Sequence, residues 1–259
     1  MRIYGEPADI YDAYIVRGLN RQGETDYQYE VLELLERLGT LVINSPAGLS
    51  LAESKAQTTF CLKQAGIPVP STLVTQSVEE AATAVKAFGT AVVKPLYGSH
   101  GIGIEKLEPD MNGMLRAFLK KYGAIYVQEY IPNEGRDIRA FVVGDEIPAA
   151  VYRIAPEGQW KTNVFQGSRC IPCELTPDVR EICLESVRVI GVDYTGVDVI
   201  VGPDGPVVLE LNGAPCWYGL CLATNCNVAL DIMSYTLRLL ESGQSARQPA
   251  VFRSWQRTL

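Results

Sequence analysis

The stretch of residues 196–212 constrains the fold of this chain more than any other part of the sequence. Two strand-like segments flank a turn centred on Asp204, which predicts a β-hairpin. Successive side chains of a strand point to opposite faces, so Glu210 and Asn212 share one face. The turn also places Asp198 opposite Glu210. The hairpin therefore predicts two carboxylates and an amide oxygen on one face of an otherwise apolar sheet.

Facing carboxylates of this kind need a compensating charge. Like charges opposite each other across strands are destabilising, and burying an unpaired carboxylate is costly. Mg²⁺ removes that penalty, because it prefers a few carboxylate oxygens together with the phosphates of a substrate. Neutralisation by neighbouring Lys or Arg side chains is the alternative, and the sequence leaves both open. Asp198, Glu210 and Asn212 are the candidate metal ligands.

A buried lysine followed by a glycine-rich loop indicates an anion site. Lys94 ends an apolar strand, where a lysine needs an anionic partner. The loop Gly98-Ser99-His100-Gly101 comes directly after it, and its backbone amides can approach phosphate oxygens closely. The loop is neither a Walker A nor a dinucleotide motif, and alone it would suit a mobile surface turn. On sequence alone, Lys55 is best interpreted as a solvated helix lysine.

Hydrophobic periodicity predicts a mixed chain of strands and helices. We expect strands at residues 12–17, 41–43, 72–75, 91–94, 125–129, 137–143, 146–153, 195–201 and 206–212. We expect helices at residues 27–38, 49–65, 78–88, 111–121, 177–190 and 228–240. The predicted parts are an N-terminal piece (1–45), a small lobe (46–130), a large lobe (131–241) and a poorly ordered tail (242–259).

Composition excludes several classes of protein. The chain has 23 Lys and Arg against 30 Asp and Glu, a net charge of −7, which disfavours a nucleic-acid binder or a protein of acidic membrane surfaces. It lacks an apolar run of about 18 residues and a signal-type N-terminus. Seven cysteines without such a signal indicate reduced thiols, so we expect a cytoplasmic protein. Its 259 residues exceed one simple core, which favours lobes that share a cleft.

Eight motifs occur in the same order as those of the ATP-grasp superfamily, which the chain resembles. The residues in these motifs resemble those of the RimK-type ligases. Among these, the motifs resemble especially the α-L-glutamate ligases that extend pterin or deazaflavin coenzymes. The motifs are Lys55, Val93–Pro95, the glycine loop, Val127–Ile131, Gly135–Arg139, Lys161–Asn163, Gly196–Asp198 and Leu209–Asn212, within residues 40–241. The resemblance implies an α+β ATP-grasp fold in which two lobes clasp ATP, here with a shortened N-terminal α/β piece.

The resemblance also implies roles for individual residues. Residues implied to bind ATP are Lys55, Lys94, Gly98, Ser99, Gly101, Gln128, Glu129, Tyr130, Ile131, Asp137, Lys161 and Asn163. Those implied to act in catalysis are Arg139, Lys161 and Asn163, while Asp198, Glu210 and Asn212 would ligate Mg²⁺, with Mn²⁺ as an alternative. A hairpin at Gly144-Asp145 predicts that Arg139 faces Ala150, with Arg153 on the other face unless a bulge intervenes.

Chemistry of this kind activates a carboxylate as an acyl phosphate and then joins it to an amine. We expect L-glutamate as the amino acid, a small acid of pterin or related type as acceptor, and a homo-oligomeric enzyme. Two alternatives remain open: the same chemistry on a protein C-terminus or amino-acid-like acceptor, and a nucleotide-binding regulator without activity. The recurrence of Cys170, Cys173, Cys216, Cys221 and Cys226 also admits a zinc or iron–sulfur site, although small buried or loop thiols fit the spacing better.

Overall fold

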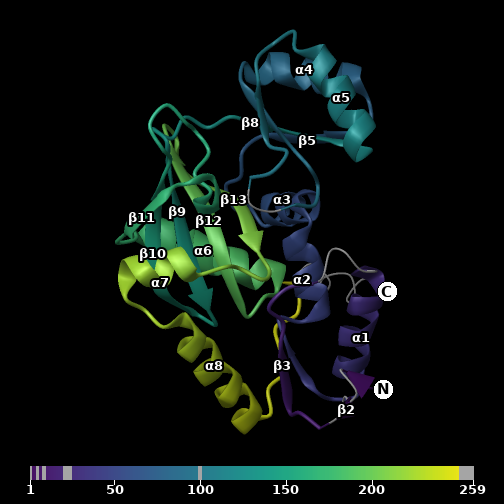
Figure 1. Cartoon of the computed structure of the whole chain (residues 1–259), viewed down its shortest axis with the longest axis vertical. Helices are drawn as coiled ribbons and strands as arrows, with labels where there is room; N and C mark the ends of the chain where they lie inside the picture. Colours follow the sequence, from purple (N-terminus) through teal and green to yellow (C-terminus); the bar gives the residue numbers. More distant parts are fainter. Residues whose placement is uncertain (1, 4–5, 8–9, 20–24, 99–100, 251–259) are drawn as a thin grey trace.

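The computed structural model describes residues 2–3, 6–7, 10–19, 25–98 and 101–250, arranged around two antiparallel sheets (Figure 1). The fold is the expected mixed α+β type. The smaller lobe lies at one end of the molecule, and the larger sheet occupies its middle. No helix among these residues is both long and apolar enough to cross a bilayer.

The small lobe is a four-stranded sheet with two helices on one face. Its elements are β5 (Thr72–Thr75), α4 (Val78–Phe88), β6 (Ala91–Lys94), β7 (Glu105–Leu107), α5 (Asn112–Tyr122) and β8 (Ile125–Glu129). The strand order is β5-β8-β6-β7, and every pair is antiparallel. Apolar side chains of α4 and α5 pack on alternate residues of β6 and β8. This packing holds Lys94, at the end of β6, against the rest of the molecule.

The large lobe is a five-stranded sheet of order β11-β10-β9-β12-β13. Its elements are β9 (Arg136–Val143), β10 (Glu146–Ile154), η1 (Val164–Gln166), β11 (Arg169–Pro172), α6 (Pro177–Ile190), β12 (Tyr194–Gly202), β13 (Gly205–Asn212), α7 (Tyr218–Thr224) and α8 (Val228–Ser242). Helix α6 packs on Ile138 and Ala140, whereas α7 and α8 pack on Phe141 and Val143. Helices thus cover both faces, and the polar end of one face stays open.

The N-terminal piece contains a short parallel strand pair that brackets a helix. Its elements are β1 (Arg2–Ile3), β2 (Glu6–Pro7), β3 (Ala13–Ile15), α1 (Thr25–Arg37) and β4 (Leu41–Ile43), with β3 parallel to β4. Asn44 follows β4 and is fully buried. Its side chain bonds the backbone of Asp193, Tyr194 and Gly213 at 2.6–3.0 Å. One amide therefore fastens this piece to the large lobe.

The single helix expected at 49–65 is wrong, because the chain forms α2 (Pro46–Glu53) and α3 (Lys55–Gln64) instead. Ser54 adopts an extended conformation between them, and its side chain accepts the amide of Gln57, which caps α3. Both helices contribute to the apolar core that α6 shares with the large sheet. The break puts Lys55 at the first position of α3, beside the glycine loop.

The C-terminal end differs from the poorly ordered tail expected from Ser242. Ser242 ends α8, and Ala246 is buried against the large lobe. The backbone amide of Arg247 donates to both oxygens of the Asp193 carboxylate at 3.2 Å, and its carbonyl accepts from Ser45 at 2.7 Å. The expectation for residues 251–259 lies outside the described residues.

Candidate active site

A row of charged side chains crosses three strands of the large sheet. The pairs Asp198–Glu210 and Asp198–Arg139 are directly opposite each other in the register, so β13, β12 and β9 contribute one residue each. The predicted pairing of Asp198 with Glu210 is confirmed, although the turn differs. Gly202 pairs with Gly205, and a bulge beside Asp198 restores the register. The bulge therefore compensates for a turn one residue shorter than expected.

A second bulge changes which residues face the site. Val143 pairs with Glu146, but a register shift before Ala149 makes Arg139 face Val151. The prediction that Arg139 faces Ala150 is therefore wrong. The shift brings Arg153 opposite Asp137 and onto the same face. Pro148 lies inside the shifted segment and cannot donate to a ladder, which is the sequence signal for the irregularity.

The acidic member at the centre of this row is buried and held by two arginines. Arg139 Nε donates to Asp198 Oδ1, and Arg139 Nη2 donates to Oδ2 at 2.8 Å. Nη2 of Arg153 lies 2.8 Å from the same Oδ2. Burial alone would raise the pKa of Asp198, but the two guanidinium groups outweigh it and lower the pKa. The neutralisation of a carboxylate by arginine, left open by the sequence, occurs at Asp198.

The path of Arg139 depends on a glycine in the neighbouring strand. A Cβ on Gly196 would lie 2.8 Å from both Cδ and Nη1 of Arg139. Any larger residue would push the arginine away from Asp198. The Gly196-Val-Asp198 motif thus supplies a carboxylate and the space for its partner.

The two predicted phosphate-binding lysines, Lys55 and Lys94, lie in different environments. Lys55 Nζ donates to the carbonyl of Gly98 at 2.9 Å and lies 3.5 Å from Glu210 Oε2. Its side chain is only 10% exposed, so its interpretation as a solvated lysine is wrong. Lys94 Nζ donates to Gln128 Oε1 at 2.7 Å. Burial lowers the pKa of Lys94 to about 8.

Lys94 therefore lacks the anionic partner that its burial requires. No carboxylate among the described residues lies within 4.0 Å of its ammonium group, and its close partner is a neutral amide. A buried cation in this state costs free energy unless an anion binds beside it. The geometry favours an anionic ligand at this position.

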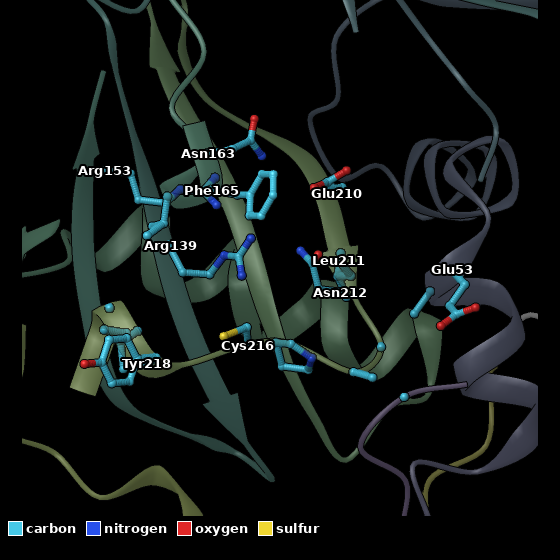
Figure 2. A pocket seen from close by; sticks show the side chains of 18 of the residues that line it. Glu53, Arg139, Arg153, Asn163, Phe165, Glu210, Leu211, Asn212, Cys216 and Tyr218 are labelled. Atoms are coloured by element: carbon cyan, nitrogen blue, oxygen red, sulfur yellow. The ribbon is translucent and has the colours of Figure 1, made fainter. Parts of the chain in front are cut away.

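Two cavities meet at this face and share lining residues. The larger one, about 450 Å³, runs from the charged row toward Phe165, Cys216 and Tyr218 (Figure 2). The smaller one, about 80 Å³, lies between the lobes. Residues predicted to bind ATP that line the smaller cavity are Lys94, Gln128, Glu129, Tyr130, Ile131, Asp137, Lys161 and Asn163. Arg153, Asn163 and Glu210 line both cavities.

Aromatic rings line the smaller cavity, and a glycine of the loop packs against Asn163 at its edge. The rings of Tyr130 and Trp160 meet edge to face at 6.0 Å, and Lys106 lies 3.8 Å from the Tyr130 ring. Gly101 has a positive φ of +71°, and a Cβ there would lie 2.5 Å from Asn163 Oδ1. The loop can approach Asn163 only as glycine. Gly98 lines the larger cavity, whereas Ser99 and His100 lie outside the described residues.

The predicted trio supplies hard oxygen donors from adjacent strands, which suit Mg²⁺. Asn212 faces Gly196 in the register, two residues along each strand from the Asp198–Glu210 pair. Its Nδ2 donates to the Gly196 carbonyl at 3.2 Å. That bond orients the amide and leaves its oxygen free to accept. No group of three or more His, Cys, Asp or Glu side chains suited to a metal occurs in the part of the chain that the structure describes. The trio contains two carboxylates, and its third donor is an amide.

The cysteines of the large lobe are spread over different surroundings. Cys170, Cys221 and Cys226 pack against the apolar core under α7 and α8. Cys173 packs against the opposite core, and Cys216 is exposed at the wall of the larger cavity. All five are free thiols.

Comparison with known proteins agrees with this geometry. A model of the RimK-like ATP-grasp domain matches residues 52–236. A tetrahydromethanopterin:alpha-L-glutamate ligase of Methanocaldococcus jannaschii is 36% identical over 250 residues, which cover 93% of this chain and 84% of the relative. A probable alpha-L-glutamate ligase of Legionella pneumophila is 34% identical over 236 residues, covering 89% of this chain and 78% of the relative.

Solved structures of ATP-grasp ligases share the fold. The ligase PsnB with a minimal precursor, Mg and ADP superposes with a TM-score of 0.68 at 24% identity, covering 90% of this chain and 80% of that one. A D-alanine–D-alanine ligase of Bacillus anthracis superposes with a TM-score of 0.67 at 19% identity, covering 91% and 83%. With a family match over most of its length and this architecture, the chain belongs to the RimK-like ATP-grasp family and is a ligase that forms C–N bonds.

Proposed function

We propose that this ligase joins L-glutamate to a small acid acceptor, of pterin-type or related coenzyme chemistry, in a reaction that consumes Mg·ATP. The observation that carries the proposal is the row of Glu210, Asp198 and Arg139 facing the two buried lysines. The row supplies oxygen donors for a hard cation, and Lys94 supplies a positive charge that no carboxylate of the described residues neutralises within 4.0 Å. The names of the relatives support glutamate and a coenzyme acceptor.

In the proposed reaction the acceptor carboxylate attacks the γ-phosphate of ATP to give an acyl phosphate and ADP. The amine of glutamate then attacks the acyl carbon, and phosphate leaves. No protein nucleophile is required, so catalysis consists of positioning and charge neutralisation. Phe165 and Tyr218 line the larger cavity beyond the charged row and offer flat apolar surfaces for the acceptor.

Most of the predicted side chains have a place in this proposal. Lys55 and Lys94 hold ATP phosphates, and the segment from Gln128 to Ile131 holds the adenine. Lys161 and Asn163 bind phosphate oxygens where the two cavities meet, and Arg139 stabilises the transferred phosphoryl group or the acyl oxyanion.

Asp198, Glu210 and Asn212 would hold Mg²⁺ or Mn²⁺. The metal would neutralise charge on the phosphates and on the leaving ADP. Asp198 still has acceptor capacity beside its arginine bonds, and within the described part of the chain Glu210 makes one long ion pair, to Lys55 at 3.5 Å. Asp137, which the resemblance implies to bind ATP, would contact the ribose or nearby groups. It lines the smaller cavity, with both carboxylate oxygens bonded to Arg153.

The same proposal includes a cytoplasmic enzyme, where ATP is available and thiols stay reduced, and association of the chain with copies of itself. Neither nucleic acid nor membrane takes part in the reaction.

The experiment that tests the proposal is ADP release with L-glutamate and a panel of acceptors, followed by mass spectrometry of each acceptor. We expect one coenzyme-type acid to gain a glutamyl residue in the presence of Mg·ATP. Addition to a peptide C-terminus would identify the protein-directed alternative, and tight ATP binding without ADP release would identify a regulator.

The metal assignment is tested with Glu210→Gln, which removes one charged oxygen while keeping the shape of the side chain. We expect loss of Mg·ATP-dependent turnover in a folded protein. Glu174→Gln, at an exposed position outside both cavities, is the matched control and should retain full activity. Retained turnover in the Glu210 variant would refute the assignment.

A further inference from the structure

Arg153 is a buried cation to which the proposed reaction gives no role. Its side chain is 5% exposed, and it comes from β10, two strands away from β12 in the sheet. The β-bulge before Ala149 turns it toward the site. Arg153 lines both the smaller and the larger cavity, so it forms part of the wall between them.

The guanidinium group of Arg153 bridges two carboxylates. Its Nε donates to Asp137 Oδ1 at 2.8 Å, and its Nη2 lies against Asp137 Oδ2 and 2.8 Å from Asp198 Oδ2. Thr162 adds a hydrogen bond to Asp137 at 2.6 Å. A planar guanidinium fork can make these contacts in a fixed orientation, whereas the ammonium group of lysine cannot.

The bridge occupies part of the acceptor capacity of Asp198. A carboxylate offers about four lone-pair positions, two on each oxygen. Oδ2 accepts from Arg139 Nη2 and from Arg153 Nη2, which occupies both of its positions. Oδ1 accepts only from Arg139 Nε among the described residues. One position, on Oδ1, remains for a further cation.

We propose that Arg153 is a positioning residue that, by bridging Asp137 and Asp198, fixes the Asp198 carboxylate so that Oδ1 faces the metal. This role rests on the proposed function, because it assumes that Asp198 is a metal ligand. The guanidinium group of Arg153 thereby connects Asp137, in the wall of the smaller cavity, to the metal ligand Asp198. Metal affinity therefore depends on a side chain that does not itself touch the metal.

The test measures metal binding directly. Water-proton relaxation with Mn²⁺ and a non-hydrolysable ATP analogue reports the ternary complex without turnover. We expect Arg153→Met to weaken Mn²⁺ binding at least tenfold, because loss of an orienting partner typically costs metal affinity by that amount. We expect Arg153→Lys, which keeps the charge without the fork, to fall in between. Arg136→Met removes an exposed arginine of β9 and should match the wild type.

Kinetics separate this role from a merely structural one. In Arg153→Lys the Mn²⁺ concentration that gives half-maximal turnover should rise, while kcat at saturating Mn²⁺ stays near that of the wild type. A structural role would lower thermal stability without changing the metal dependence of the folded fraction. Adding Asp137→Asn to Arg153→Met removes the carboxylate left without its partner. It should recover part of the lost stability but not the Mn²⁺ affinity, because Asp198 still lacks the arginine that holds it.

The outcomes are distinct. Wild-type Mn²⁺ affinity in both Arg153 variants would overturn the positioning role while leaving the metal assignment intact. If Arg153→Met does not fold, Arg153→Lys decides in the same way. Absence of Mn²⁺ binding by the wild type with the nucleotide analogue would refute the metal assignment itself, and the role of Arg153 with it.

Discussion

Replacing Lys94 by methionine should abolish nucleotide binding without destabilising the ligand-free protein. Lys94 is buried, and its only close polar partner among the described residues is the amide of Gln128. Burial lowers its pKa to about 8 from an ordinary value of 10.5. Methionine fills similar space without a charge. The variant therefore separates the energetic cost of the buried cation from its use in binding an anion.

The free-energy cost of burying the charged Lys94 follows from its pKa. A difference of about 2.5 pH units, at about 1.4 kcal/mol each, means that the charged lysine costs the folded state about 3 kcal/mol at pH 7. Between pH 8 and 10.5 the unfolded chain binds a proton that the folded chain has lost, so stability rises with pH and the cost falls to about 1.4 kcal/mol near pH 9.5. Leaving Gln128 Oε1 without its donor costs about 1–3 kcal/mol at either pH.

Urea unfolding at pH 7 and pH 9.5 measures this balance. We expect Lys94→Met to be as stable as the wild type at pH 7 or more stable by up to about 2 kcal/mol, and to lose about 2 kcal/mol of that relative stability at pH 9.5. Mg·ATP should raise the free energy of unfolding of the wild type but not of the variant. Lys86→Met, at a mostly exposed position, is the control and should show neither effect. A stability difference that is the same at both pH values would refute a buried charged lysine.

Two further predictions concern the sheet and its junction with the N-terminal piece. Gly196→Ala should lower kcat about a hundredfold or more, because the added Cβ displaces Arg139 from Asp198. Gly113→Ala, whose Cβ meets open space, is the control and should leave kcat unchanged. Steady-state kinetics measure both variants, and equal kcat values would contradict the role of Arg139. Burial raises the pKa of Asp193 to about 6. Between pH 3.8 and 6 the folded chain therefore holds a proton that the unfolded chain has released. The wild type should lose up to about 3 kcal/mol of its free energy of unfolding as the pH rises through 6. Asp193→Asn should be free of that loss in unfolding experiments at pH 4.5 and 7, and a parallel pH dependence in the two proteins would disprove it.

Local sequence was sufficient for the elements whose periodicity and turns are strong. The strand ending at Lys94, the helices of the small lobe and the pairing of Asp198 with Glu210 follow from alternation, capping residues and turn chemistry. These signals operate over a few residues, so they survive whatever the rest of the chain does. The eight motifs in order also identified the family through their resemblance to it, and the family match over residues 52–236 confirms that assignment.

Tertiary structure decided the features that depend on register and on distant partners. Sequence periodicity does not count bulges, so it placed Arg139 opposite the wrong residue and could not show Arg153 beside Asp137 and Asp198. It missed the break at Ser54, although Ser54 followed by Gln57 is a local capping pattern. The approach of Lys55 to Glu210, in contrast, depends on packing against the large sheet. The sequence by itself determined which groups carry charge and on which strand they lie. Only the packed sheet decided which charges neutralise each other, because a one-residue shift moves every side chain to the opposite face.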